Sequence, residues 1–308
     1  MEQAPPEVER RSRGRLITFK VLAVLFGMGA AIGLFGAGII VGWFDTEGGQ
    51  IHRVHDIGFG VLAGVFLTVG FLAQLHVPER KVSVRYQIVA AGVAAMGAGL
   101  LASDPGNGLF FLLMPVAELA IMVAVHPARM ALMRGGGSFS PVMAVLAAAG
   151  AVPLVWVSLT WARLQRTGLD TDPHVEKGHW TIMTAMAFAI LLVALLSSLK
   201  FSGWKITAWC AGAGAFLYGL ASLVFATFPG TNVPYPGSQG AGWGAVAMVG
   251  GLLFIAAAQW EAVRSRTGRR DCGRTARPRS DRWLASRSGG TPKSFSSNCR
   301  CNLQSLRE

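Results

Sequence analysis

The sequence contains few charged residues. Asp, Glu, Lys and Arg make up 14% of its 308 residues, whereas about 25% is typical of soluble domains. Hydrophobic residues make up 52%, and the mean hydropathy is +0.45. This combination excludes an ordinary soluble globular protein. It also excludes a disordered chain, which requires low hydrophobicity.

Several chemical signatures are missing as well. The chain has no H-E-x-x-H metal motif, no G-x-x-x-x-G-K-[ST] phosphate loop and no G-x-S-x-G nucleophile elbow. Its four cysteines form no C-x-x-C pair, and none falls in a segment expected outside the cell, so we expect no disulfide framework. A soluble catalytic domain is therefore not indicated, and enzymatic activity is expected only if it lies within the membrane.

Eight long apolar runs dominate the sequence. A membrane helix needs about 20 mostly apolar residues, and these runs are continuous rather than alternating, which favours helices over β-barrel strands. The first run lacks a small-residue cleavage site in the usual place, so we expect it to remain as a span. The sequence thus predicts an all-α polytopic membrane protein with eight transmembrane helices. They are expected at residues 17–43, 55–76, 86–103, 109–126, 141–162, 179–199, 205–228 and 240–262.

The basic residues predict how the chain is oriented in a plasma (inner) membrane. Five Lys and Arg near the N-terminus and seven in alternate loops fall on one side, against four on the other. By the positive-inside rule the richer side is cytoplasmic, which places both termini in the cytoplasm. Residues 1–16 are then a basic cytoplasmic segment. Residues 263–308 form a basic tail, expected to be disordered and to contact anionic lipid rather than nucleic acid, although an altered reading frame would also explain its composition.

An offset of 124 residues aligns the second half of the chain with the first. It superimposes His55 on His179 and Pro105-Gly106 on Pro229-Gly230. We therefore expect two four-helix repeats, residues 17–126 and 141–262, joined by a cytoplasmic linker at 127–140. Parallel repeats are related by an axis along the membrane normal. The alternative is a chance coincidence between apolar segments.

A histidine and acid cluster is predicted on the outer face. His52 and His55 are three residues apart, which places them on one side of a helical turn. In the stretch 170–176, acidic residues and a histidine occupy every second position, so in an extended chain their side chains would all point to the same side. Imidazole suits Zn, Cu, Fe and Ni. The sequence predicts a metal site, or a haem held by His55 and His179; the alternative is hydrogen bonding at the ends of spans. The candidate metal ligands are His52, His55, His174, His179, Asp172 and Glu176.

Glu118 suggests a second possible function. It falls near the middle of the fourth predicted span, and an intramembrane carboxylate is costly enough to indicate a role. It would be the coupling carboxylate of a small-molecule or ion transporter, unless it is protonated and hydrogen-bonded to a neighbouring helix. A third possibility is a structural envelope protein that binds no small ligand.

Several short stretches resemble an uncharacterised family of actinobacterial multi-pass membrane proteins. The resemblance would extend over about residues 15–262 and implies no activity. It rests on the stretches His55-Asp56-Ile57-Gly58-Phe59-Gly60, Phe71-Leu72-Ala73-Gln74-Leu75, Pro78-Glu79-Arg80 and Gly178-His179-Trp180. The duplicated eight-span plan is also similar to that of haem A synthases, which carry a His in each of spans two, four, six and eight. Here spans two and six carry His55 and His179, but the outer ends of spans four and eight carry none, so no catalytic residue is transferred.

Overall fold

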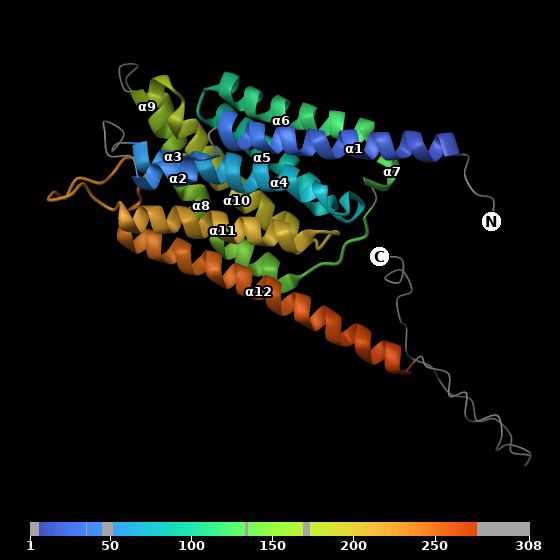
Figure 1. Ribbon diagram of the computed structural model, residues 1–308. Coiled ribbons are helices and arrows are strands. Elements are labelled where there is room, and N and C mark those ends of the chain that lie inside the picture. Colours follow the sequence, from blue (N-terminus) through green and yellow to red (C-terminus); the bar gives the residue numbers. More distant parts are fainter. Residues whose placement is uncertain (1–5, 35, 45–51, 133–134, 169–172, 276–308) are drawn as a thin grey trace, which may run out of the picture. The chain divides into compact units, whose positions relative to one another are not determined.

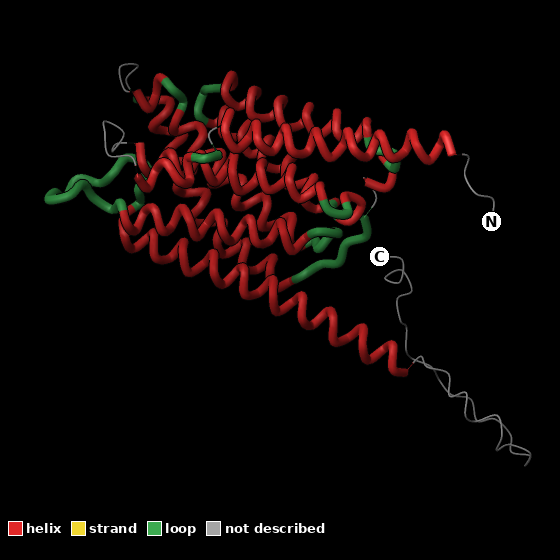
Figure 2. The backbone as a smooth tube through the Cα atoms, in the orientation of Figure 1, coloured by secondary structure: helices red, strands yellow, loops and turns green. Residues whose placement is uncertain are grey.

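The computed structural model describes residues 6–34, 36–44, 52–132, 135–168 and 173–275. Every regular element among these residues is helical (Figures 1 and 2). The chain divides into two units, residues 1–259 and 260–308, and the helical bundle is the first of them. The fold is therefore all-α, as the continuous apolar runs predict.

The longer elements are α-helices, and shorter turns interrupt the first two membrane segments. The α-helices are α1 (Pro6–Met28), α2 (Gly38–Phe44), α3 (Arg53–Gly60), α4 (Val69–Leu72), α5 (Val82–Leu101), α6 (Pro105–Val125), α7 (Arg129–Leu132), α8 (Pro141–Thr167), α9 (Pro173–Glu176), α10 (His179–Ser198), α11 (Trp204–Val224) and α12 (Gly240–Thr275). The segments Gly29–Gly33 and Val61–Thr68 are π-helical, and Ala73–Leu75 and Pro78–Arg80 are short 3-10 turns.

Eight helical segments among the described residues are long and apolar enough to cross a membrane. They overlap all eight expected runs, so the polytopic fold is confirmed at this level. The segments are Ser12–Phe44, Arg53–Leu75, Val82–Leu101, Pro105–Val125, Pro141–Thr167, His179–Ser198, Trp204–Val224 and Gly240–Ser265.

Close backbone contact at glycines explains how the first two spans pack. A Cβ atom on Gly60 would overlap the backbone nitrogen of Ile39, and one on Gly64 would come within 2.9 Å of the Gly36 carbonyl oxygen. Apolar side chains gain little by leaving lipid, so membrane helices associate through small residues that let backbones approach. These glycines therefore hold the start of the second span, and with it α3, in a fixed position.

Helix α10 lies at the centre of the bundle. It packs against α5, α8 and α11, and most of its residues are buried. Helix α1 runs beside α6, and α11 runs beside α12 (Figure 1). Helices α3, α10 and α12 begin at the same end of the bundle, which we call the histidine end because His52, His55, His174 and His179 lie there.

The structure adds detail at both ends of the chain. Helix α1 begins at Pro6, so part of the basic segment 1–16 belongs to the first helix, and proline suits a first helical position. Residues 264–275, expected to be disordered, belong to α12. Once a helix has formed, each further residue adds one hydrogen bond. After Gly240, where α12 begins, the next proline in the sequence is Pro278. Residues 276–308 lie outside the described residues.

The structure adds detail to the proposed duplication without testing it. Pro105 is the first residue of α6, but Pro229, which the offset aligns with it, lies in the loop before α12 begins at Gly240. The linker expected at 127–140 includes the short helix α7. The two-repeat plan and its boundaries stay predictions.

Candidate metal centre

Four histidines from three elements meet at the histidine end. His52 immediately precedes α3, and His55 lies in its first turn. His174 comes from α9, and His179 is the first residue of α10. One ligand nitrogen from each of the four lies within 4.8 Å of the others. The structure thus brings together four of the six predicted metal ligands around a single point.

The spacing of the imidazole rings suits one tetrahedral ion. The ring centroids of His55 and His174 are 4.8 Å apart, and those of His52 lie 5.0 Å from both His174 and His179. Zinc binds imidazole nitrogen at about 2.0–2.1 Å, so four tetrahedral ligand nitrogens lie about 3.4 Å apart. Small rotations of the four rings would bring their nitrogens to that spacing.

Aromatic side chains and a loop enclose the cluster. His55 and His174 are buried, whereas His52 and His179 are half-buried. The Trp180 ring lies edge-on to His55, with centroids 4.8 Å apart, and is tilted against His174 at 5.5 Å. A Cβ atom on Gly237, in the loop before α12, would lie 3.3 Å from Nε2 of His55. The cluster therefore sits in a water-poor environment, where interactions with a charged ion are strengthened.

Asp104 fixes the start of α10 beside the cluster. Its Oδ2 atom accepts hydrogen bonds from the Asn107 side-chain amide and from the Thr181 hydroxyl, both at 2.8 Å. Thr181 is two residues after His179. Gly178, which precedes His179, has a φ of +67°, and a Cβ atom there would overlap the side-chain nitrogen of Asn107. The beginning of α6 thereby positions one of the four ligands.

The acidic residues are arranged differently from the expectation. The stretch around His174 was expected to be extended, but Pro173–Glu176 forms the helical turn α9. Residues two apart on a helix point in nearly opposite directions. His174 therefore faces the cluster while Glu176 is exposed and is not among the four grouped ligands. Asp172 lies outside the described residues.

The geometry fits an ion better than a haem. Axial haem ligands lie on opposite faces of a wide planar ring, which must pass between them. Here each of the four rings is paired with the other three, at centroid distances from 4.8 to 6.3 Å. The Trp180 ring also packs against both His55 and His174, at centroid distances of 4.8 and 5.5 Å. His52 and His174 lie about as close to His55 and His179 as those two lie to each other, at 5.6 Å, which suits four ligands around one ion rather than two ligands on opposite faces of a plane.

Glu118 does not join this cluster. It lies in α6, where its side chain is half-buried. Among the described residues it has no hydrogen-bond or ion-pair partner, and it is not in the group of metal ligands. The structure therefore confirms its place within the fourth span but supplies no second group for a coupling site.

A second polar cluster lies at the opposite end of the bundle. Arg85 is one of the seven basic residues assigned to loops from the sequence, but it is buried in the first turn of α5. Its guanidinium donates to Gln74 Oε1 at 2.9 Å, to the Pro78 carbonyl at 2.7 Å and to the Leu132 carbonyl. This residue therefore ties α5 to α7 and to the end of the second span, a structural role that the loop-charge interpretation missed.

His126 lies beside this cluster, after the end of α6. Its Nε2 atom is 3.3 Å from Glu79 Oε1, and its Nδ1 accepts the backbone N–H of Ala128 at 3.1 Å. Burial lowers the pKa of His126, and the nearby Glu79 only partly opposes this effect. The imidazole is therefore more difficult to protonate in the folded protein than in the unfolded chain. His76, the other histidine at this end, is exposed.

Sequence reasoning found the four histidines because histidine is rare in this chain and four of the six fall near the same predicted span ends. It did not predict the contacts of Trp180 and Gly237 with the cluster or the positioning role of Asp104, because these depend on contacts between distant segments. No protein-family model, curated protein or solved structure matches the chain.

Proposed function

We propose that this membrane protein binds one transition-metal ion through His52, His55, His174 and His179. The observation that carries the proposal is that one nitrogen from each ring lies within 4.8 Å of the other three. Four partly or fully buried imidazoles rarely gather without a shared ligand, because their protonated forms repel one another and lose solvation.

The donor set favours Zn²⁺. Four neutral imidazoles in a compact arrangement match the four-coordinate tetrahedral geometry of structural zinc sites. Cu²⁺ and Ni²⁺ are the main competitors, since imidazole also suits them and copper exceeds zinc in intrinsic affinity. With all four positions filled by protein, no site remains open for water or substrate. The ion would therefore join the start of α3 to α9 and α10 rather than perform hydrolysis.

Metal analysis of the purified protein tests this proposal. The protein would be extracted in mild detergent, incubated with Zn²⁺ and desalted, and its metal content and absorption spectrum would then be measured. We expect about one Zn²⁺ per chain and no Soret band. His55→Ala and His179→Ala should each lose most of the bound metal. His76→Ala, which removes an exposed histidine at the other end of the bundle, should retain it.

Two results would contradict the proposal. One is a folded protein that retains no Zn²⁺, Cu²⁺ or Ni²⁺ after incubation with each. The other is a Soret band that disappears in His55→Ala, which would identify a haem protein instead. Equal metal loss in the His76→Ala control would show that the metal is bound elsewhere.

The setting of the site follows from the membrane topology that we propose. The uneven distribution of Lys and Arg supports an inner-membrane location with both termini in the cytoplasm, which would place the histidine end outside. The excess of Arg in residues 264–308 supports contact between the tail and anionic lipid. Membership of the actinobacterial family that the sequence resembles is likewise an inference from the sequence.

A further inference from the structure

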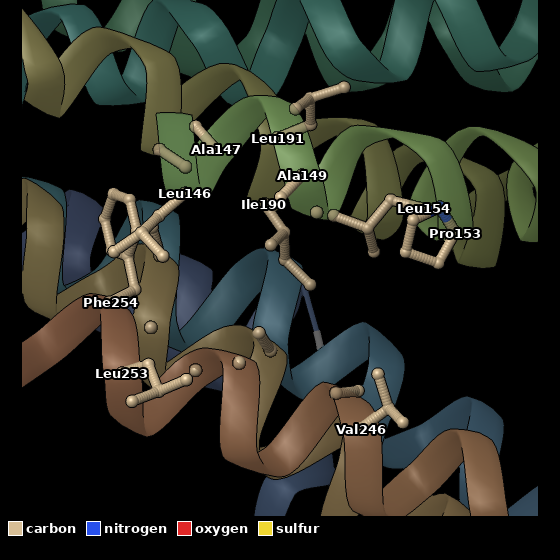
Figure 3. A pocket seen from close by; sticks show the side chains of 18 of the residues that line it. Leu146, Ala147, Ala149, Pro153, Leu154, Ile190, Leu191, Val246, Leu253 and Phe254 are labelled. Carbon is tan, nitrogen blue, oxygen red and sulfur yellow. The ribbon is translucent and has the colours of Figure 1, made fainter. Parts of the chain in front are cut away.

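A large apolar cavity lies between four helices of the bundle. Its volume is about 280 Å³, and α8, α10, α11 and α12 line it. Figure 3 shows Leu146 and Pro153 of α8 on one side and Val246 and Phe254 of α12 on the other, with Ile190 of α10 beside the space between them.

The lining suits hydrocarbon and not water. It contains no charged residue, and only Tyr218 and Trp243 carry polar side-chain atoms. A buried water needs two to four polar partners, and an engineered apolar cavity of about 150 Å³ in another protein stays dry and binds benzene. The present cavity is almost twice that size. In a bilayer it would be filled by the apolar chain of a lipid.

The cavity matches the depth of one membrane leaflet. Along α12 it extends from Trp243, near the histidine end, to Phe254. Eleven residues of helix rise about 16 Å at 1.5 Å per residue, and half of a hydrocarbon core of about 30 Å is about 15 Å. Along α8 the cavity extends from Pro153 and Leu154 to Leu146 in the same direction. A single chain entering at the histidine end would therefore reach to about the middle of the bilayer.

The cavity has access from the side of the bundle. Ala149 of α8 and Val246, Gly250 and Leu253 of α12 line it and are also exposed. These residues form the rim between two helices that both carry many exposed apolar side chains. A lipid chain can therefore enter laterally from the bilayer, without passing through the polar ends of the bundle.

Trp243 provides a hydrogen-bond donor at the histidine end of the cavity. Its Nε1 atom is buried and has no hydrogen-bond partner among the described residues. The neighbouring Tyr218, whose ring centroid is 4.9 Å from that of Trp243, already donates its hydroxyl to the Gly237 carbonyl at 2.9 Å. A buried donor without a partner costs about 1–3 kcal/mol. This atom has almost no accessible surface, so a ligand oxygen in the cavity would satisfy it only after the indole ring turns towards the cavity.

We propose that the cavity binds one acyl chain of a phospholipid from the leaflet at the histidine end, and that the Trp243 ring turns on binding so that its indole N–H donates to an ester carbonyl. Four features favour this ligand. They are the length of the cavity, its lateral rim, its apolar lining and the Trp243 hydrogen-bond donor at the depth of the lipid ester. The proposal does not depend on the bound metal.

Native mass spectrometry tests the proposal directly. The protein would be reconstituted in vesicles of palmitoyl-oleoyl phosphatidylglycerol, extracted in mild detergent, and its retained phospholipid counted. We expect one tightly retained phospholipid on the wild type. Gly150→Leu should reduce retention at least tenfold, because Gly150 lines the cavity and a Cβ atom there meets no atom within 4 Å. Gly97→Leu is the matched control, since Gly97 of α5 is equally open but lies outside the cavity.

Trp243→Phe tests the hydrogen bond separately from the volume. It keeps an aromatic ring and removes only the indole donor, so we expect about fivefold weaker retention. Wild-type protein that retains no phospholipid, or Gly150→Leu that retains as much as Gly97→Leu, would overturn the proposal. Unchanged retention in Trp243→Phe would overturn the assigned carbonyl contact. The metal content of Gly150→Leu should equal that of the wild type, which separates this result from failure of the histidine site.

Discussion

Asp104 lies outside the four-histidine group but controls one of its members. Its carboxylate accepts the Thr181 hydroxyl at 2.8 Å, and Thr181 belongs to the same first turn of α10 as His179. Groups that orient metal ligands from the next layer typically change metal affinity about 10- to 100-fold when removed. Asp104 is far from His179 in the sequence, yet we expect its removal to weaken metal binding.

Thr181→Val should weaken zinc binding about tenfold. Valine keeps the shape of threonine but cannot donate to Asp104, so the start of α10 loses its tie to α6. Competition with a zinc chelator would measure the dissociation constant. Thr160→Val is the control, because the Thr160 hydroxyl donates to the Trp156 carbonyl of its own helix. Equal affinities in the two variants would show that Asp104 does not position His179.

Acidification should destabilise the protein through His126. Because burial lowers the pKa of His126, the unfolded chain takes up this proton first. Stability is therefore complete above the ordinary histidine pKa of about 6.5 and is lost as the pH falls from there towards the lowered folded value. His126→Asn does not titrate, and its amide oxygen can still accept the Ala128 N–H.

Thermal unfolding of the chelator-treated protein between pH 7.5 and pH 5.5 measures this effect. We expect the midpoint of the wild type to fall more steeply with acidification than that of His126→Asn, because the variant lacks the proton uptake at this position. The difference between the two slopes separates the effect of His126 from that of the four histidines of the cluster. Parallel slopes would contradict the argument.

The loop between α11 and α12 forms one wall of the histidine cluster. It spans residues 225–239, and two of its glycines have positive φ angles, +73° at Gly230 and +83° at Gly237. Only Gly237 faces a neighbour: a Cβ atom there would lie 3.3 Å from Nε2 of His55, whereas one on Gly230 meets nothing within 4 Å. Alanine at Gly230 should therefore introduce backbone strain alone, whereas alanine at Gly237 should introduce the same strain and also contact the His55 ring.

Gly237→Ala and Gly230→Ala should lose similar stability, because an alanine at positive φ costs about 1–2 kcal/mol at either position. Only Gly237→Ala should also weaken zinc binding, by several-fold, since its methyl group displaces the His55 ring. Unfolding midpoints of the metal-free proteins and zinc affinities would be compared. Equal zinc affinities in both variants would show that the loop does not control His55.

The helices could be predicted from the sequence, whereas the short elements between them could not. Each span is a continuous apolar run, and hydropathy alone locates it. The turn α9 is different, because alternation over residues 170–176 suggested an extended chain. Its conformation depends on α8, where Gln165 donates to the Val175 carbonyl at 2.7 Å. A contact of this kind, between segments on different helices, leaves no trace in local periodicity.

At the scale of the whole molecule, the sequence predicts the grouping of the four histidines more successfully than it predicts the arrangement of the helices. Four rare histidines near the ends of spans could be grouped in advance, because a bilayer forces all such ends into two planes. The sequence does not predict the central position of α10 or the cavity between α8 and α12. The apolar runs are nearly uniform, so they do not indicate which face of each helix packs inward.

The orientation of the molecule can be tested by cysteine labelling from outside intact cells. The positive-inside rule predicts that the loop before α12 is external and the segment before α8 is cytoplasmic. In a variant without its native cysteines, Asn232→Cys should therefore react with a membrane-impermeant maleimide in intact cells. Gly136→Cys should react only after lysis. Both positions are exposed, so a difference in labelling reports the side of the membrane rather than burial. The reverse pattern would place the histidine cluster on the cytoplasmic side, where the metal would be drawn from the cell interior.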